Sequence, residues 1–505
     1  MRYQGDRYAS LRAMRIPITR RTLLQSALAA GGLVGMGTRS PLIAVARQKP
    51  QGDKTGTSSP TAALAMARLH NRPQFSDLPP KAIDHAKILV ASTVAAAGTG
   101  STYASSRIIR DLGKEFGGKP QATIWFDGVK LPMPEAARVN SVLANAAAGD
   151  DTDIDTATHP GPELIPTGIV VGEATGATGQ ELISAIVTGF EAQNRMGRAL
   201  SGGTSRLMYA SQTVAFGAVV IAGRLLKLTD EQLAHAIGIT AMTMGGLAIG
   251  TNSQVRDYGG SNAALCAVNA ALAAGRGFTV NEDMLEAKGG FLEVFGTGHP
   301  ESLTVDFKEW AIVKYLAIKL WPGAWPNSSL TEAAINAARK SDVSSDQVAK
   351  ILLSGPRLKT IGGSRHPKNF SEAIHSLPYF IASAVADKDF TWAHATPEKF
   401  NSPVAARLML LIELDPMPSP VHYDFPWGGT VTIVTKSGAR YTSTVDAQRG
   451  SAPRGIEWSD IDAKYRILMP DARLPGKRGE EALNMIHHLE QVKNVSELVR
   501  TLQPG

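Results

Sequence analysis

The chain has 505 residues, too many for one simple core, and its 43% hydrophobic and 19% charged residues are typical of a globular protein. Aromatic residues make up 6% while alanine and glycine are abundant, a balance that favours closely packed helices. Residues 1–46 hold seven arginines and one aspartate, so they contribute +6 of the formal net charge of +7. The remaining sequence is almost neutral and has no stripe of Lys and Arg with interleaved aromatic residues, so we expect no nucleic-acid partner.

The basic N-terminus has the pattern of a twin-arginine export signal. In "TRRTLLQSALAAGGLVGMG", Arg20 and Arg21 precede a modestly apolar run that is too short for a spanning helix, and residues 44–46 form a small-x-small cleavage pattern. We therefore predict a signal peptide at 1–46 and a polar linker at 47–60. The mature protein is then periplasmic or secreted and meets the membrane only during export. An uncleaved membrane anchor remains the alternative.

The sequence contains a single cysteine, Cys266, which can form no internal disulfide even in an oxidising compartment. It lies in an Ala-rich stretch with a helical pattern. We therefore predict a buried, inert thiol rather than a nucleophile.

Helical periodicity dominates residues 61–316. Two capping boxes mark helix starts, one from Thr178 to Glu181 and one from Thr229 to Gln232. A short extended excursion, "ATIWFDGVKLP", has the Asp-Gly signature of a hairpin. These signals predict an all-helical domain with one small hairpin.

The composition changes after "WPGAWPNSS", a joint broken by prolines. Residues 317–455 contain the strand-like stretches "QVAKILLSG" and "GTVTIVTKSGARYTSTV", interspersed with the helical patterns "SEAIHSLPYFIASAVA" and "PVAARLMLLIEL". Residues 456–505 are helical again, and we expect them to pack back on the first domain. The predicted fold class is mainly α, with an α+β domain inserted between the N-terminal and C-terminal segments of a helical domain.

The stretch "AGDDTDIDTATHPGPELIP" concentrates acidic residues. Asp151, Asp153 and Asp155 have the one-apart spacing of a calcium loop, but an EF-hand needs glycine at its sixth position and glutamate at its twelfth. Here those positions are Thr156 and Pro162, so the EF-hand interpretation fails. We assign no metal ion, although an irregular cation site with fewer carboxylates remains open.

Two further interpretations of this stretch compete. In the first it is a turn, in which Gly149 ends one helix and three prolines shape the approach to the next. In the second it is a proton-transfer site, because a histidine beside several carboxylates has a raised proton affinity and can serve as an acid near neutral pH. His159 is the residue that makes the second interpretation hard to dismiss.

The order of six motifs resembles the MmgE/PrpD family from about residue 60 to the end. They are "NAAAGDDTDIDTATHPG", "GFEAQNRMGRAL", "FGAVVIAGRLLKLTDEQLAHAIGI", "RDYGGSNAALCAVNAALAAGRGFT", "KYLAIKLWPG" and "HPKNFSEAIHSLPYFIASAV". The resemblance implies dehydratase, decarboxylase or epimerase chemistry on small di- or tricarboxylic acids without an organic cofactor or iron-sulfur cluster. It also implies a homodimer, an α+β lid over the helical domain, and an active site in the cleft between them.

The chain departs from the family pattern at several positions. Where the family usually has Asp-aromatic-Asp-Asp, this sequence has Ala-Gly-Asp150-Asp151, so the leading aspartate is absent. A family histidine before the "FGAVVIAG" helix falls on Met208 or Tyr209, and another is replaced within "GAWPNSS". The downstream His159-Pro160 pair is kept. We therefore identify a divergent, exported member of the family.

The resemblance and the residues together suggest roles for five side chains. His159, or Asp151 acting with it, is the best remaining base or acid for breaking a C–H bond next to a carboxylate. Arg256 and Lys319 match family lysine positions and are the best remaining carboxylate anchors. His366, in the predicted lid, is a further candidate for substrate binding.

The function predicted from the sequence is that of a lyase or isomerase acting on a small polycarboxylate, by proton abstraction followed by elimination or reprotonation. A carboxylate-binding protein of the periplasm, which keeps the fold but has lost the proton-transfer residues, is the alternative. A metal-dependent site at the aspartates is a third interpretation.

Overall fold

The computed structural model describes residues 59–201, 208, 210–296, 299–305, 308–418 and 420–504. The predicted signal peptide and almost all of the predicted linker therefore lie outside the described residues, as does Tyr209. Residues from 59 onward form one unit in which segments far apart in the sequence contact each other. Within the described part of the chain, no helix is long and apolar enough to cross a membrane.

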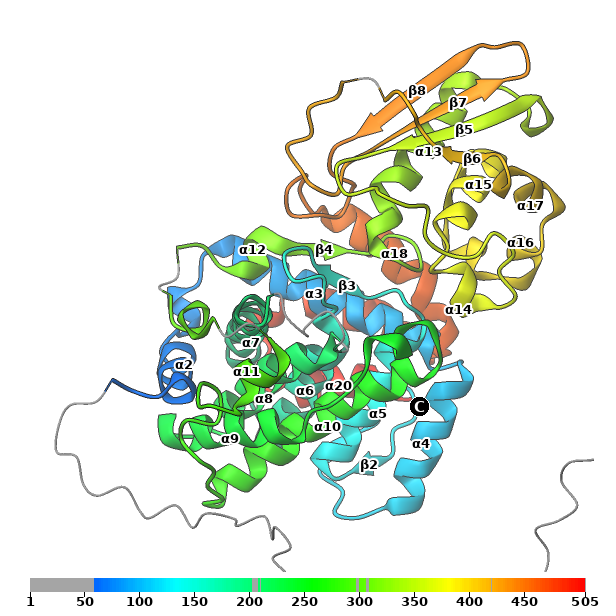
Figure 1. Ribbon diagram of the computed structural model, residues 1–505. Helices are drawn as coiled ribbons and strands as arrows, with labels where there is room; N and C mark the ends of the chain where they lie inside the picture. The colour runs from blue at the N-terminus through cyan, green and yellow to red at the C-terminus, as the bar shows by residue number, and fades with distance from the viewer. Residues whose placement is uncertain are drawn as a thin grey trace, which may run out of the picture. The chain divides into compact units, whose positions relative to one another are not determined.

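Helices dominate the first part of the chain, which confirms the predicted mainly α class (Figure 1). They are α2 (Ala62–Asn71), α3 (Pro80–Gly100), α4 (Ala104–Phe116), α5 (Met133–Ala146), α6 (Gly161–Thr175), α7 (Gly179–Ala199), α8 (Ser211–Leu225), α9 (Asp230–Thr243), α10 (Val255–Gly275), α11 (Phe291–Phe295) and α12 (Ala311–Tyr315). Both predicted capping boxes are present, with Thr178 and Glu181 at the start of α7 and Thr229 and Gln232 at the start of α9.

The predicted hairpin is a pair of very short antiparallel strands, β1 (Ala122–Thr123) and β2 (Lys130–Leu131). Gly128 in the turn between them has φ 84°, which favours glycine. The hairpin contacts α5 and α6.

A four-stranded sheet with the order β6-β5-β7-β8 organises the second part of the chain. Its strands are β5 (Val348–Ser354), β6 (Ile412–Leu414), β7 (Gly429–Thr435) and β8 (Arg440–Val445). The predicted hairpin β7–β8 turns at Gly438, where φ is 88°. Its helices are α13 (Ser328–Ser341), α14 (Phe370–Ala373), α15 (Leu377–Asp387), α16 (Pro397–Phe400) and α17 (Pro403–Met409), of which α13 packs on β7 and β8.

One predicted helix is only half helical. The sequence predicts a helix over 403–414, but α17 ends at Met409 and the last three residues form β6. Strand β6 pairs in parallel with β5, so the main-chain groups of this apolar run are satisfied by the sheet rather than by a longer helix. Tertiary pairing here outweighs the local helical pattern.

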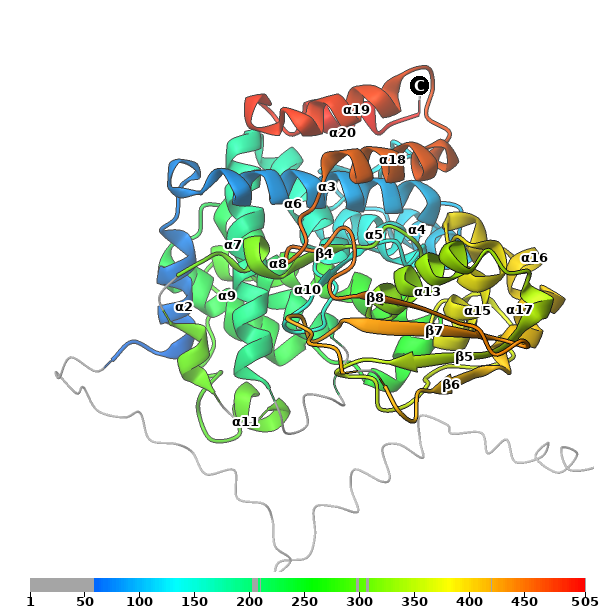
Figure 2. The same ribbon diagram turned by 90° about the horizontal axis from the view of Figure 1, so that it is seen from above.

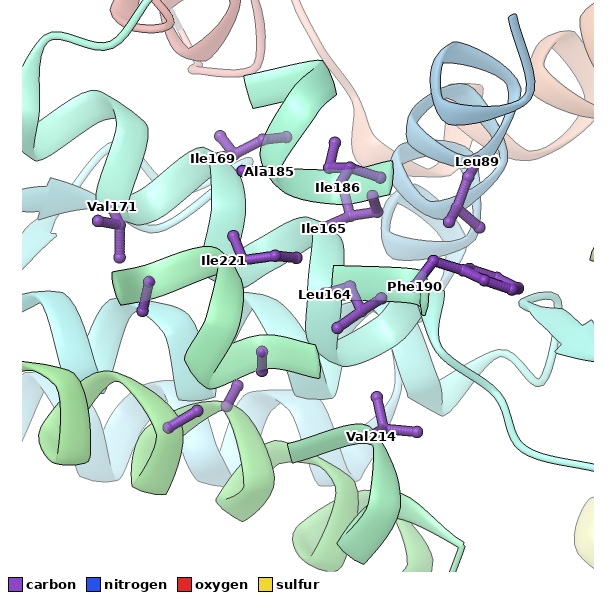
Figure 3. Packing of buried hydrophobic residues seen from close by; sticks show 14 of the residues in the cluster. Leu89, Leu164, Ile165, Ile169, Val171, Ala185, Ile186, Phe190, Val214 and Ile221 are labelled. Carbon is purple, nitrogen blue, oxygen red and sulfur yellow. The ribbon is translucent and has the colours of Figure 1, made fainter. Parts of the chain in front are cut away.

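The larger hydrophobic core lies between α3, α6, α7 and α8 (Figure 3). Ile165, Ile186 and Phe190 at its centre are completely buried. Helices α7 and α8 approach each other closely because a Cβ atom on Gly217 would lie 2.4 Å from the main-chain oxygen of Gly189. The abundance of small residues therefore reflects close helix packing, as the composition predicts.

The C-terminal segment packs back on the first part of the chain, as predicted. Helices α18 (Trp458–Leu468), α19 (Arg478–His487) and α20 (Ser496–Thr501) form this return, and α18 lies along α3 (Figure 2). Side chains from 456–502 share the larger core with those from 63–318, while residues between 330 and 445 form a second core. The boundaries predicted at 316/317 and 455/456 stay a prediction.

Gly179 lies where α7 meets this C-terminal segment. A Cβ atom there would be 1.7 Å from the main-chain oxygen of Leu489. We predict that Gly179→Ala lowers the free energy of unfolding by about 1–3 kcal/mol through overpacking, as measured by urea denaturation. Gly362→Ala is the control, because nothing lies within 4 Å of its Cβ, and it should change stability by less than about 0.5 kcal/mol. Equal stability of the two variants would contradict the close packing.

Candidate active site

The acidic stretch is organised by a short strand. Asp151–Asp153 form β3, which pairs antiparallel with β4 (Leu316–Ile318), a strand that the sequence patterns do not predict. The main-chain N–H of Lys319 continues this pairing and donates to the oxygen of Asp150 at 3.1 Å. The stretch is therefore more than a turn before a helix, because its pairing with β4 brings Asp150 next to Lys319 from a distant segment.

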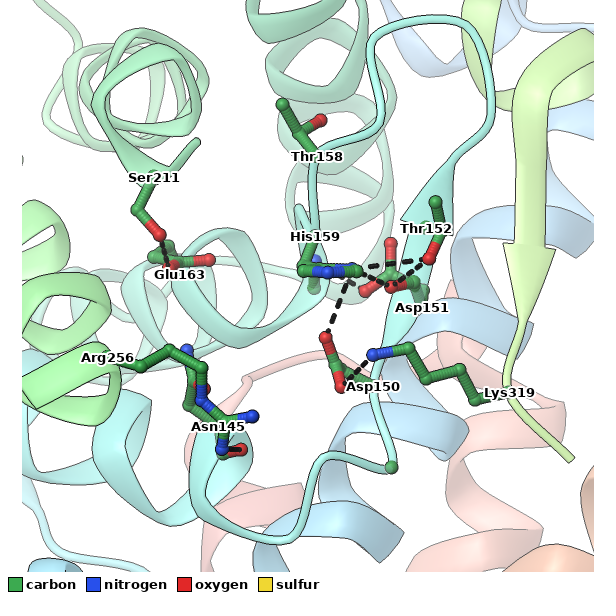
Figure 4. A network of polar contacts seen from close by, with 12 residues as sticks. Asn145, Asp150, Asp151, Thr152, Thr158, His159, Glu163, Ser211, Arg256 and Lys319 are labelled. Carbon is green, nitrogen blue, oxygen red and sulfur yellow. Dashed lines mark hydrogen bonds and ion pairs between the residues drawn. The ribbon is translucent and has the colours of Figure 1, made fainter. Parts of the chain in front are cut away.

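Asp150 is the centre of a polar network in this region (Figure 4). Its carboxylate accepts a hydrogen bond from Lys319 Nζ at 2.7 Å and lies 3.4 Å from Nδ1 of His159. Both side chains of the Asp150–Lys319 pair are 5% exposed. Burial acts to raise the pKa of Asp150, but the neighbouring Lys319 and His159 outweigh it and lower that pKa to about 2. The acid is therefore ionised.

His159 faces the cavity with 40% of its side chain exposed. Its Nδ1 donates to the main-chain oxygen of Asp151 at 2.7 Å, which leaves Nε2 as the nitrogen that can accept a proton. The raised proton affinity predicted from the sequence is wrong. Burial and the positive charge of Lys319 lower the pKa of His159 to about 4, although Asp150 opposes them. At neutral pH this side chain is a base rather than an acid.

Asp151 is fully buried behind His159 and does not line the cavity. Its Oδ1 accepts from the N–H of Gly161 at 2.8 Å, at the start of α6, while Oδ2 has no partner. Burial and the nearby Asp150 raise the pKa of Asp151 to about 7. Its hydrogen bond with His159 is made by the main-chain oxygen, so this residue orients the imidazole rather than exchanging a proton with it directly.

The carboxylates of the other two aspartates in the stretch contact polar side chains of α7. Asp153 accepts from Gln193 at 2.7 Å and Asn194 at 2.8 Å, and Asp155 pairs with Arg198. Neither carboxylate converges with Asp151 on a common point. Across the residues that the structure describes, no three His, Cys, Asp or Glu side chains are grouped so that they could hold a metal ion. The one-apart spacing is therefore explained by anchoring to α7.

A cavity of about 260 Å³ lies between the helical part and the segment that follows β4. Its wall includes three of the predicted site residues, His159, Arg256 and Lys319. Arg256, near the start of α10, is 14% exposed, and its guanidinium donates to Asp257 at 2.9 Å and to the main-chain oxygen of Asn145 at 3.2 Å. The cavity is smaller than the roughly 300–1,000 Å³ of drug-sized ligand sites, and it therefore suits a small acid.

His366 does not reach this cavity. Its side chain is exposed, and the residue does not belong to the cavity wall. The histidine that lines the cavity from the second part of the chain is His375, between α14 and α15. Its Nδ1 donates to the main-chain oxygen of Ser371 at 2.7 Å, and burial lowers its pKa. Both histidines lie in the same family-like motif, and the sequence alone favoured the wrong one.

Lys464 is a buried residue near the site and is not among the site residues predicted from the sequence. It lies on α18, and its ammonium donates to Ser92 Oγ at 2.7 Å and to the main-chain oxygen of Gly149. Burial lowers its pKa to about 7, although Asp150 and Asp151 oppose the shift. The signal was present in the sequence, because a lysine at this spacing falls among the apolar residues of the buried face of α18.

Gly149 is required by the same packing. A Cβ atom at this position would lie 2.7 Å from the ring of Trp392. The preceding helix α5 does not end through Gly149, as the turn interpretation expects, because Ala148 takes the left-handed conformation with φ 50°. Trp392 therefore occupies the space beside the loop from another segment of the chain, and Lys464 Nζ lies 5.7 Å from the centre of its ring.

Comparison with known proteins identifies the family. A model of the MmgE/PrpD N-terminal domain matches residues 65–304, and a model of the MmgE/PrpD C-terminal domain matches residues 328–491. The chain belongs to the MmgE/PrpD family. Each sequence motif on its own is weak evidence for the family, but the two domain models together match most of the chain.

Several curated relatives of this MmgE/PrpD protein are cis-aconitate decarboxylases. The human enzyme is 22% identical over 438 residues, which cover 84% of this chain and 90% of the relative. The mouse enzyme is 24% identical over 413 residues, which cover 78% of this chain and 84% of the relative. The enzyme of Aspergillus terreus is 26% identical over 239 residues, which cover 44% of this chain and 48% of the relative.

The departures from the MmgE/PrpD pattern lie on the cavity wall. Ala148, at the position of the usual leading aspartate, lines the cavity, and so does Met208, near the position of a usual histidine. The cations Arg256 and Lys319 remain on the wall. The cavity wall therefore keeps two cationic side chains and lacks two of the polar groups that the family pattern leads us to expect.

Asp151 gives a stability test of this arrangement. Its pKa of about 7 lies above the ordinary value of 3.8, so the folded protein holds an extra proton in this range and loses stability as pH rises through it. We predict that Asp151→Asn becomes more stable relative to the wild type between pH 4 and 7, by up to about 1.4 kcal/mol per pH unit. Urea denaturation of both proteins at several pH values measures this difference. If the stability of Asp151→Asn relative to the wild type stayed constant or fell as pH rises, Asp151 would not retain a proton in the folded protein.

Proposed function

We propose that this protein is a lyase that acts on a small di- or tricarboxylic acid through proton transfer at a carbon next to a carboxylate. Membership of the MmgE/PrpD family and the decarboxylase relatives make it an enzyme of lyase type. The observation that carries the finer proposal is the convergence of His159, Arg256 and Lys319 on one small cavity. Dehydration and decarboxylation are both compatible with this arrangement.

His159 is proposed as the base. Its Nδ1–H is held by the main-chain oxygen of Asp151, so Nε2 keeps a free lone pair at neutral pH. Asp150, 3.4 Å from Nδ1, stabilises the imidazolium that forms when Nε2 takes a proton. The base is therefore neutral before the reaction and electrostatically supported after it.

Arg256 and Lys319 are proposed as the carboxylate anchors. The carboxylate next to the reacting carbon gains negative charge when the C–H bond breaks, and fixed cations stabilise that enediolate-like state. Arg256 is already held by Asp257 and Asn145, so its orientation costs little to fix when the substrate binds. The ammonium of Lys319 carries three protons, one of which it donates to Asp150.

A carboxylate-binding protein without catalysis is the second candidate, and the position of Ala148 favours it. The loss of the usual leading aspartate removes an acid from the cavity wall, whereas the anchoring cations remain. Such a protein would bind the same acids without breaking a bond in them.

Epimerisation is a further reaction that fits the same site. It needs proton transfer without elimination, and it would use Arg256 and Lys319 as carboxylate anchors in the same way.

We further propose that the protein works as a homodimer after export through the twin-arginine pathway. Met242, Leu247 and Ile249 are 74%, 71% and 86% exposed, and they lie in the segment that precedes Arg256. Exposed apolar side chains gathered beside a site are typical of a protein interface. A second copy of the chain would cover them and close the segment that holds Arg256.

Solvent exchange tests the enzymatic proposal. The protein without residues 1–46 is incubated with a panel of di- and tricarboxylates in deuterated water, and NMR follows product formation and deuterium uptake. We predict that His159→Gln lowers the rate by about 10²–10⁴-fold, because the base is lost, while thermal stabilisation by the acid is retained. His422→Gln, a change at an exposed histidine, should leave the rate unchanged. Thermal stabilisation without reaction in the wild type would favour the binding protein instead.

The oligomer is tested by light scattering after gel filtration. We predict a dimer for the wild type and a shift toward monomer for Ile249→Glu, because a charge would be buried in the interface. Met417→Glu, at a side chain that is 85% exposed in another segment, should keep the wild-type mass. A monomeric wild type at micromolar concentration would refute the proposed dimer.

A further inference from the structure

A second acid lies close to the cavity, on the wall formed by α6 and α8. Glu163 is completely buried, and its Oε1 accepts a hydrogen bond from Ser211 Oγ at 2.7 Å. Ser211 itself lines the cavity. Figure 4 shows this pair on one side of His159, with Asp150 and Lys319 on the other. The Ser211 hydroxyl therefore faces the cavity and is hydrogen-bonded to Glu163, on the wall away from the Asp150–Lys319 pair.

The contacts of Glu163 differ from those of a structural carboxylate. It lies in the first turn of α6, yet the N-terminus of that helix has no side-chain cap. None of the ion pairs in the described part of the chain includes Glu163, and its Oε2 is buried without a hydrogen-bond partner. A buried carboxylate with neither a cation nor full hydrogen bonding is costly, and such a group takes up a proton instead.

The surroundings of Glu163 favour its protonated form. Burial raises its pKa well above the ordinary value, the hydrogen bond from Ser211 opposes this, and the charges of Asp150 and Asp151 add to the increase. Helix α10 closes over the acid, because a Cβ atom on Gly260 would lie 2.7 Å from Glu163 Oε1. Ser211 is therefore the contact through which this acid meets the cavity.

We propose that Ser211 and Glu163 form a proton relay that supplies a proton to the reacting substrate from the wall away from Lys319. This inference rests on the proposed lyase function and adds the acid that a dehydration needs beside the base His159 and that a decarboxylation needs to protonate carbon. Ser211 is the proposed catalytic residue, because it touches the cavity. Glu163 acts through Ser211 and is a positioning and proton-donating residue.

The proton balance of the relay closes in both lyase reactions. In a dehydration, the Ser211 hydroxyl turns from Glu163 Oε1 toward the substrate, and the protonated Glu163 donates to Ser211 Oγ in its place. The C–O bond then breaks with its electron pair going to oxygen, the leaving oxygen takes the Ser211 hydroxyl proton, and Glu163 passes its own proton to Ser211. In a decarboxylation, the C–C bond breaks, its electron pair stays on carbon as carbon dioxide leaves, and the Ser211 proton forms the new C–H bond. Glu163 is left as a carboxylate in both cases. It regains a proton from His159 through solvent after dehydration, or from water after decarboxylation.

The variants Glu163→Gln and Ser211→Ala test the relay against a structural role. Glutamine keeps the size of the side chain and an acceptor for Ser211, but it cannot release a carboxylic proton. We predict that each variant lowers kcat by about 10²-fold, with KM changed far less, and that the double variant is no slower than Ser211→Ala. Ser211→Thr, which keeps the hydroxyl, should recover most of the activity.

Infrared spectroscopy gives a readout that does not depend on turnover. In deuterated buffer at neutral pH, the difference spectrum between the wild type and Glu163→Gln should contain a carboxylic-acid C=O band that belongs to Glu163, because the contribution of Asp151 is present in both proteins and cancels. This band should be shifted in Ser211→Ala. The absence of this band in the wild type, or full kcat in Glu163→Gln, would overturn the relay while the proposed lyase function stands. A wild type that is inactive on every acid of the panel would overturn the lyase function and the relay together.

Discussion

The buried pair of Asp150 and Lys319 is the interaction on which the candidate site depends. Two ions that are each 5% exposed are stable only as a pair, because either one alone would be an uncompensated buried charge. The pairing of β3 with β4 brings them together, and the main-chain bond between the same two residues fixes their registry. His159 is held from this strand, so the base and one carboxylate anchor derive their positions from a single short sheet.

The loop before that strand depends on packing from distant segments. Gly149 leaves the space that Trp392 fills, and its main-chain oxygen accepts a hydrogen bond from the buried Lys464 on the C-terminal return. The segment after residue 455 therefore supports the site as well as the core. In its charged form, Lys464 also offsets the negative charges of Asp150 and Asp151, which oppose the lowering of its pKa by burial.

The sequence predicts the parts of this structure that have local causes. Capping boxes, the turn at Gly438 and the helical return follow from patterns within a few residues, and the structure confirms them. The order of six motifs indicated the family, and Arg256, Lys319 and His159 do line one cavity. The predictions that failed concern features that depend on tertiary contacts. Strand β6 forms because β5 lies beside it, and His375 replaces His366 because of where α14 and α15 place them.

The direction of the pKa shift of His159 shows why chemistry is harder to predict than fold. The sequence shows the carboxylates beside the histidine, but Lys319 and the degree of burial become visible only in three dimensions. Glu163 was likewise hidden among prolines, with no local sign that it lies behind Ser211. Side-chain neighbours therefore decide whether a group donates or accepts a proton, and the spacing of acids along the chain does not.

A crystal structure with a slowly reacting tricarboxylate bound is the most direct test of the central claim. We predict one carboxylate on Arg256, another on Lys319, and the reacting carbon within contact distance of Nε2 of His159, with the Asp150–Lys319 pair intact. A ligand bound outside this cavity, or one whose carbon atoms face away from His159, would contradict it.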